Sequence, residues 1–282
     1  MIPMIIINGL VLSLTYFLVA SGLTIVFSIM GIINFAHGAI IMLGGMVAYY
    51  TFTFLGINFY FSIILAMAAT AIISVVLKRV VFDYFANFPL AGCIAAVGIG
   101  MIIQQGALVG LGGEDKVFVN ALPLDLIKLF GITISLDRII IVLVSFAIMI
   151  GMLTFLQFTK AGLIIRATTQ EPIASQLCGV NNGYVSAISM ALGGALAGAA
   201  GALLGALFTV SPYWGESLIL KAFVVIIIGG LGSVLGAIIG SFILGFVESI
   251  GITISGYITF VLVFVLIVIL LLLRPKGILG HE

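Results

Sequence analysis

Charged residues are scarce in this sequence, and that scarcity excludes a soluble protein. Asp, Glu, Lys and Arg make up 7% of the 282 residues, against 63% hydrophobic residues, whereas a soluble domain carries about 25% charged residues. Long apolar runs recur along the whole chain, as in helices that cross a membrane. A transmembrane β-barrel is disfavoured, because its strands alternate apolar and polar residues over about 10 positions. We therefore expect an all-α polytopic membrane protein, with a single transmembrane domain over residues 1–282.

Cysteine, histidine and long basic tracts are also nearly absent, which removes several classes of site. Cys93 and Cys178 lie far apart and form no CxxC pair, so a redox or metal role is disfavoured. His37 has only His281 as a second histidine, and no nucleophile, base and orienting group occur at a recognisable spacing. The net charge of +1 gives no sign of nucleic-acid binding. We expect no metal, no cofactor, no nucleic-acid partner and no enzymatic activity in this chain.

The apolar runs predict about eight transmembrane segments. Six runs suit one full crossing each, which takes about 20 residues. The first has no basic residues before it, so we expect a retained membrane helix rather than a cleaved signal peptide. Two further regions, 21–56 and 218–253, are too long for one crossing, and each is broken by glycine near its middle. The six expected full spans are 4–20, 58–77, 87–110, 138–158, 184–208 and 255–273.

Three clusters of basic residues predict which loops face the cytoplasm, because short cytoplasmic loops carry an excess of Lys and Arg. Placing all three clusters inside gives a consistent path with both termini in the cytoplasm. Each broken region is then either a re-entrant hairpin or a pair of short crossings. The clusters are Lys78 with Arg79, Lys160 with Arg166, and Arg274 with Lys276.

The two broken regions occupy matching places in the chain. A shift of 195 residues lays 21–56 on 216–251, and each then reads as an apolar run, a polar or glycine break and a second apolar run. Such matching breaks predict two structurally similar halves and point to a transport pathway. Non-helical backbone at membrane depth persists only where it is buried in protein or lines a watery cavity. We therefore expect the breaks to line or support a translocation path.

Two polar side chains mark the first break, in the stretch IINFAHGAIIMLGG at 32–45. In one interpretation, Asn34 and His37 contact a transported solute. In the other, Asn34 caps a half-helix that starts near Phe35, and His37 bonds to a nearby carbonyl group. The second interpretation is favoured.

Small residues at helical spacing predict close packing between helices. The glycine-rich stretch 226–240 is not interpreted as a phosphate-binding loop, because it lacks the lysine and serine pattern of such loops. The residues that carry the packing prediction are Gly194, Gly198, Ala202, Gly236 and Gly240.

One acid, Glu248, lies inside an apolar run. An ion-coupled transporter would use such a residue to bind a proton or sodium ion. We expect Glu248 near the outer end of its segment, in contact with water, so ion coupling is the less favoured alternative. Gln104 and Gln105 are uncharged and are interpreted as packing or path residues.

The polar loop at residues 160–183 is too long for a simple turn. Its middle predicts a short helix over 171–177, with Pro172 in the first turn and Gly179 beyond the end. Such a helix either docks on a cytoplasmic partner or lies on the lipid surface. Docking is favoured, because a lipid-surface helix would carry more Lys and Arg.

Three stretches together resemble the LivH-type permeases of branched-chain amino acid ABC importers. The loop sequence RATTQEPIASQLCGVN resembles the loop through which ABC importer permeases contact their ATPases. GLTIVFSIMGIINFAHGAIIMLGGMVAYY and LKAFVVIIIGGLGSVLGAIIGSFILGFVES resemble the two signature regions of the LivH type, and the likeness extends from about residue 9 to 279.

This resemblance implies a function, partners and site residues. It implies a permease in the bacterial inner membrane that works with a second, LivM-like permease, two cytoplasmic ATPases and an external binding protein. The implied substrates are branched-chain amino acids, while similar permeases carry urea, short amides or other amino acids. The implied ATPase-coupling residues are Arg166, Ala167, Glu171, Ala174 and Gly179. The implied residues of the broken helices or the path are Asn34, His37, Gly38, Gly229, Gly230, Gly232 and Ser233.

Overall fold

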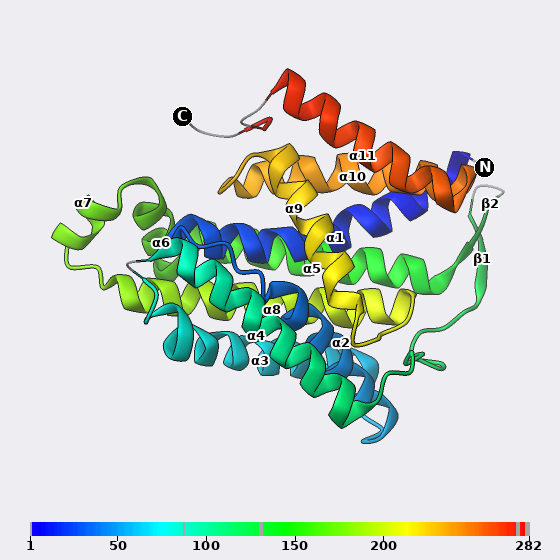
Figure 1. The fold of residues 1–282 in the computed structure, drawn as a ribbon. Helices are drawn as coiled ribbons and strands as arrows, with labels where there is room; N and C mark the ends of the chain where they lie inside the picture. The colour runs from blue at the N-terminus through cyan, green and yellow to red at the C-terminus, as the bar shows by residue number, and fades with distance from the viewer. Residues whose placement is uncertain (1, 87, 130–131, 275–276, 280–282) are drawn as a thin grey trace.

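A bundle of helices with one short hairpin forms the computed structural model (Figure 1), which describes residues 2–86, 88–129, 132–274 and 277–279. Lys276, His281 and the first residue of the expected span 87–110 lie outside the described residues. The elements are α1 (Ile2–Met30), α2 (His37–Thr53), α3 (Phe59–Leu77), a π-helical turn η1 (Lys78–Phe82), α4 (Pro89–Leu111), β1 (Leu126–Leu129), β2 (Ile132–Ser135), α5 (Leu136–Phe158), α6 (Lys160–Gln170), α7 (Pro172–Leu177), α8 (Asn182–Leu207), α9 (Trp214–Gly229), α10 (Val234–Ile254) and α11 (Gly256–Leu273).

Helix α1 is the centre of the bundle. It packs against α5, α8, α9 and α10, and its residues from Leu12 to Val26 are buried without interruption. A helix that is apolar on every face lies either inside protein or against lipid, and the burial of α1 places it inside the bundle. The expected span 4–20 is therefore only the first part of α1, which continues to Met30 and ends where Gly31 takes a φ of +63°.

The all-α membrane fold is confirmed. Among the described residues, six helices are long and apolar enough to cross a membrane. Five of them correspond to expected spans. The sixth is α10, which lies in the second broken region, whereas the expected span 255–273 corresponds to α11.

The two chain termini lie at opposite ends of the bundle (Figure 1). Near the start of α1, the carbonyl of Ile5 accepts a hydrogen bond from Ser249 Oγ at 2.8 Å. Near its end, Ser28 Oγ donates to the carbonyl of Gly232 at 3.0 Å. The C-terminal tail lies at this second end, where Ile278 N–H donates to the carbonyl of Ile228 at 2.9 Å. We call the end with Lys78, Arg79, Lys160, Arg166 and Arg274 the basic end, and the opposite end, with β1 and β2, the hairpin end.

This arrangement differs from the expected path, which put both termini at the same end of the bundle. That path counted residues 4–20 as one crossing and the broken region 21–56 as a separate excursion. Instead, α1 runs from the hairpin end to the basic end, and the chain returns to the hairpin end through 31–36 and α2. The two helices together make no net crossing, so the start of α1 and the start of α3 lie at the same end.

A folded loop covers part of the hairpin end. Strands β1 and β2 pair antiparallel, with Leu126 opposite Ser135, and were not predicted from the sequence. Closer to α4, the ring of Phe118 lies 5.5 Å from the ring of Tyr49 and 5.6 Å from that of Phe59. Lys116 and Val210 exchange backbone hydrogen bonds of 2.8 and 2.9 Å. The loop thus fixes the chain segment 208–213 that leads into α9.

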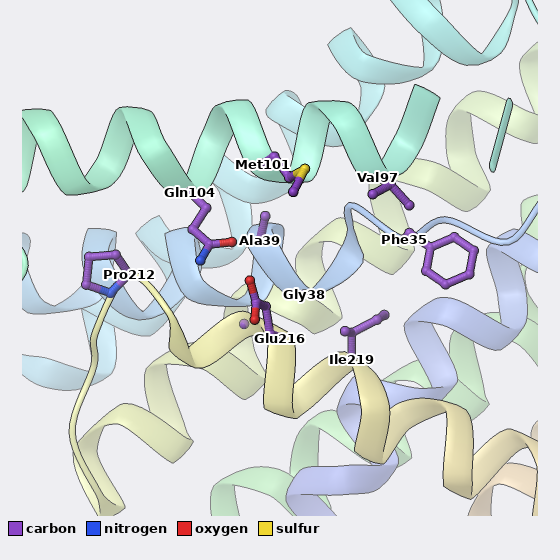
Figure 2. Close-up of a pocket in the computed structure, with 11 residues that line it drawn as sticks. Phe35, Gly38, Ala39, Val97, Met101, Gln104, Pro212, Glu216 and Ile219 are labelled. Carbon is purple, nitrogen blue, oxygen red and sulfur yellow. The ribbon is translucent and has the colours of Figure 1, made fainter. Parts of the chain in front are cut away.

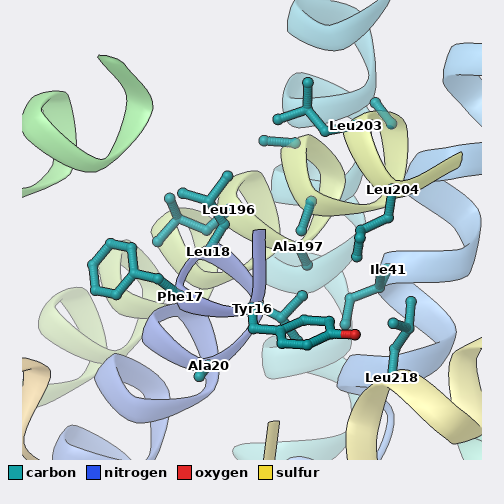
Figure 3. Close-up of a cluster of buried hydrophobic side chains, with 14 of the residues drawn as sticks. Tyr16, Phe17, Leu18, Ala20, Ile41, Leu196, Ala197, Leu203, Leu204 and Leu218 are labelled. Carbon is teal, nitrogen blue, oxygen red and sulfur yellow. The ribbon is translucent and has the colours of Figure 1, made fainter. Parts of the chain in front are cut away.

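Close packing of α8 on its neighbours confirms the role predicted for the small residues. Gly194 approaches Ser74, and Gly198 approaches both Thr70 on α3 and Gly44 on α2. The same is true in α10, where Gly236 approaches Gly229 and Gly240 approaches Val225. Figure 3 shows the core that results, with Leu18 of α1 and Ile41 of α2 beside the α8 residues Leu196, Ala197, Leu203 and Leu204.

We predict that Gly201→Ala destabilises the protein, whereas Gly106→Ala does not. A methyl group at Gly201 would collide with the carbonyl of Ile41, while nothing lies within 4 Å of the corresponding position at Gly106 on α4. The collision should cost about 1–3 kcal/mol, and alanine on an open helix surface should stabilise by about 0.5–1 kcal/mol. Thermal unfolding in detergent measures both. An unchanged midpoint for Gly201→Ala would show that the α2–α8 contact tolerates expansion.

Candidate functional site

Helix α2 begins near the middle of the bundle rather than at its surface. The Nε2–H of His37 donates to the carbonyl of Val19 at 3.0 Å, and Val19 lies near the centre of α1. The eleven residue steps from Val19 to Met30 measure about 16 Å along α1. Residues 31–36 therefore carry the chain back from the basic end to half the depth of the bundle before α2 starts.

Helix α9 begins at the same depth, but the chain reaches it from the hairpin end. Val210 lies beside Gly45 on α2, whereas Gly215, in the first turn of α9, lies beside Gly38. Gly38 and Gly45 are separated by about 10 Å of helix, so residues 211–214 lead the chain inward by that distance. From there α9 runs toward the basic end, where Ile228 pairs with the C-terminal tail.

The starts of α2 and α9 touch through backbone atoms. A Cβ atom at Gly38 would collide with the carbonyl oxygen of Gly215, and a Cβ at Gly215 would collide with that of Gly38. Only glycine permits this approach at both positions. The contact brings two helix N-termini, with their free N–H groups, to one point inside the bundle.

Several of these N–H groups have no acceptor among the described residues. The backbone nitrogens of Gly38 and Ala39 on α2, and of Gly215 and Glu216 on α9, form no hydrogen bond within the described chain. The first N–H groups of a helix carry partial positive charge. This point in the bundle is therefore rich in donors.

Asn34 and His37 hold the break in shape. The Oδ1 of Asn34 accepts from the N–H of Ala36 at 3.1 Å, and the carbonyl of Asn34 accepts from the N–H of His37 at 3.1 Å. Both side chains are buried, and the described hydrogen bonds of both go to backbone groups. This arrangement matches the structural interpretation, except that α2 starts at His37 and Asn34 bonds to Ala36 rather than capping the helix directly.

A cavity of about 230 Å³ lies beside the two helix starts, between α2, α4 and α9. Figure 2 shows Gln104 and Glu216 directed toward one another across it. Gln104 is 9% exposed and has no hydrogen-bond partner among the described residues, while Glu216 is exposed. The other residues that line the cavity are Phe35, Gly38, Ala39, Val97, Gly100, Met101, Pro212, Gly215 and Ile219.

The second predicted break lies elsewhere, near the basic end. Gly230 and Gly232 take φ values of +104° and +84°, and Ser233 Oγ accepts from the N–H of Gly236 at 3.0 Å, which caps α10. Gly229 packs on Gly236. The structure thus does not bring this group together with Asn34, His37 and Gly38, and of the predicted path residues only Gly38 lines the cavity. A path role for the second group stays a prediction.

An ion pair with the partly exposed Lys221 accounts for Glu248. Its Oε1 lies 2.7 Å from the Nζ of Lys221, which also donates to the hydroxyl of Tyr16 at 2.7 Å. Glu248 is 7% exposed, so the expectation that it meets water at the outer end of its segment is wrong. The sequence around Glu248 gives no sign of this ion pair, because Lys221 lies on a different helix, α9.

The loop at residues 160–183 projects from the basic end as α6 and α7 (Figure 1). The predicted short helix over 171–177 is α7, and Gly179 beyond it takes a φ of +87°. The five predicted coupling residues are all exposed: Arg166, Ala167, Glu171, Ala174 and Gly179.

Glu216 and Gly215 were missed by reasoning from the sequence. Glu216 is the only acid in the apolar segment 214–229, and an ionisable residue inside such a segment is the signal that could have identified it. Gly215 gives no such signal, because its importance depends on the approach of Gly38 from a distant part of the chain.

Comparisons with known proteins agree on one family. A family model described as "Branched-chain amino acid transport system / permease component" matches residues 5–273. The chain is 32% identical over 243 residues to the high-affinity branched-chain amino acid transport system permease protein BraD of Pseudomonas aeruginosa, covering 81% of this chain and 79% of BraD. It is 31% identical over 241 residues to LivH of Escherichia coli K12, covering 80% and 78%.

One solved structure resembles the whole fold. PsaBC from Streptococcus pneumoniae, in complex with Fab, aligns with a TM-score of 0.52 over 95% of this chain and 91% of that chain. The sequence identity is 15%, so the likeness concerns the fold alone.

We predict that Glu248→Gln destabilises the protein by about 1.5–3 kcal/mol, because it removes a charge-assisted hydrogen bond and leaves the partly exposed Lys221 without its anion. Replacing both residues, as Lys221→Met with Glu248→Leu, should recover most of the loss, since no buried charge remains. Thermal unfolding in detergent compares the variants. If the single variant unfolds at the wild-type temperature, the pair does not stabilise the bundle.

Proposed function

The chain belongs to the family of branched-chain amino acid transport system permease components, and on that premise we propose that it is one permease subunit of an ATP-driven importer for branched-chain or related amino acids. The observation that carries this proposal is the family match over residues 5–273. The proposed partners are a second, LivM-like permease, two cytoplasmic ATPases and an external binding protein that delivers the solute.

The coupling loop (residues 160–183) has the features of a docking element. Ile173 and Leu177 on α7 are 74% and 85% exposed, and apolar side chains at the tip of a projecting helix suit insertion into a cleft of a partner. Glu171 and Arg166 add charges that would fix the partner's orientation. We assign the ATPase contact to this loop.

Helix α6 is held firmly on the end of α5, so that a force on the loop reaches the bundle. Thr159 Oγ1 accepts from the N–H of Gly162 at 3.0 Å, and Arg166 Nη2–H donates to the carbonyl of Gln157 at 3.1 Å. A Cβ atom at Gly162 would collide with carbonyls of the last α5 turn. In the proposed cycle, ATP-driven closure of the ATPases moves the loop, and the bundle alternates between inward-open and outward-open states.

The proposed orientation puts the basic end in the cytoplasm of a bacterial cell, with the inner membrane around the bundle. It rests on the positively charged residues at that end, among them Lys78 and Arg79. The coupling loop and the C-terminal tail would then face the cytoplasm, and the start of α1 would face outward.

We predict that Glu171→Lys lowers ATP-dependent uptake roughly tenfold, because charge reversal at a docking contact weakens it by more than 1 kcal/mol. Glu114→Lys is the matched control, since Glu114 is exposed in the loop at the hairpin end, far from α7. Uptake by reconstituted transporter and co-purification of the ATPases are measured. Full uptake and co-purification with Glu171→Lys would exclude this loop as the contact.

We predict that a membrane-impermeant maleimide labels Leu55→Cys in intact spheroplasts but labels Cys178 only after the membrane is opened. Leu55 is exposed between α2 and α3 at the hairpin end, and Cys178 is exposed in the coupling loop. Cys93→Ser provides the background, with Cys178→Ser added for the Leu55 variant. Labelling of Cys178 in intact spheroplasts would reverse the orientation.

A further inference from the structure

Glu216 lies at a depth where a carboxylate facing lipid would be unfavourable. Its neighbour Gly215 touches Gly38, which follows His37 at the level of Val19 in the middle of α1. Glu216 is exposed, and no cationic side chain among the described residues forms a salt bridge with it. An acid at the centre of a bilayer costs about 2.5–3.5 kcal/mol or more. This face of the bundle must therefore meet water or a partner subunit.

The wall beside Glu216 offers donors of the kind that bind a carboxylate. The free N–H groups of Gly38, Ala39 and Gly215 belong to residues that line the cavity at two helix N-termini, where anions are favoured. Independently, the amide of Gln104 is nine-tenths buried, points into the cavity and has no partner among the described residues (Figure 2). The polar atoms of this amide open onto the cavity, so a ligand or water there can satisfy them.

We infer that this cavity binds the zwitterionic head group of an amino acid during transport. The carboxylate of Glu216 accepts hydrogen bonds from the substrate ammonium group. The substrate carboxylate accepts from the N–H groups at the starts of α2 and α9 and from the Gln104 amide. This assignment rests on the proposed function, and it identifies where in the path the substrate is recognised.

The rest of the cavity suits an aliphatic side chain. Phe35, Val97, Met101 and Ile219 provide an apolar lining from the first break, α4 and α9. The volume of about 230 Å³ is below the range of roughly 300–1,000 Å³ that is usual for drug-sized ligands. A small amino acid with a branched apolar side chain fits these dimensions and this chemistry.

The other charged group inside the bundle is not an alternative site for the head group. Lys221 already contacts Glu248 and Tyr16 at 2.7 Å each. Its charge is therefore neutralised within the protein, whereas Glu216 and Gln104 are left for a ligand.

The experiment compares Glu216→Gln with wild type in the complete transporter, reconstituted in proteoliposomes with its ATPases and binding protein. Labelled leucine uptake and ATP hydrolysis are measured together. We expect Glu216→Gln to lower uptake about tenfold, because a charge-assisted hydrogen bond to the ammonium group is lost. Glu216→Asp should recover part of the rate. Ser217→Ala, the adjacent exposed position on α9, serves as the matched control and should transport normally.

The outcomes separate this inference from the function on which it rests. If wild type transports leucine and Glu216→Gln does so within twofold of wild type, the head-group site is wrong while the importer function stands. If wild type transports no amino acid, both fail. If Glu216→Gln does not assemble, Gln104→Leu carries the test, because it removes the amide at similar volume. Uptake is then expected to fall, and normal uptake by an assembled Gln104→Leu transporter overturns the site.

Discussion

The close backbone contact between Gly38 and Gly215 is the constraint on which the rest of the structure depends. In a bilayer, every backbone N–H and C=O group must find a partner inside the protein or in a watery cavity. Helices α2 and α9 both begin at half the depth of the bundle. Their first turns touch at Gly38 and Gly215, where a Cβ atom on either glycine would collide with the backbone of the other helix. Free donors at that depth are tolerable only beside a polar path, which is why the cavity lies there.

The remainder of the bundle supports this contact and connects it to the basic end. His37 ties the start of α2 to α1, and Gly22 of α1 packs on Gly193 of α8. Helix α8 follows the coupling loop directly along the chain. A displacement of α6 and α7 thus has a short, closely packed route to the half-helix starts. Small residues along α8 make the route rigid, because they let backbones touch without flexible side chains between them.

The sequence predicts the membrane class, five of the six long spans and both breaks, because these follow from local hydropathy and glycine. The polar residues Asn34 and His37 within an apolar stretch indicate the first break. Three features could not be predicted, since each depends on contacts between distant segments. The first span was expected to end at residue 20, whereas α1 continues to Met30 and its Gly22 packs on Gly193, so the start of α1 and the C-terminal tail lie at opposite ends of the bundle. Glu248 was expected to be accessible to water, because its ion pair with Lys221 is not visible in the sequence. The importance of Gly215 likewise depends on its contact with Gly38, which comes from a distant part of the chain.

The central claim is that the face formed by α2, α4 and α9 borders the solute path and not the lipid. A cryo-EM map of the complete transporter in a lipid nanodisc, with amino acid present, tests it most directly. We expect this face to be turned toward the second permease, with solute or water density between Gln104 and Glu216. Ordered acyl chains packed against Glu216, with the path on another face of the bundle, would contradict it.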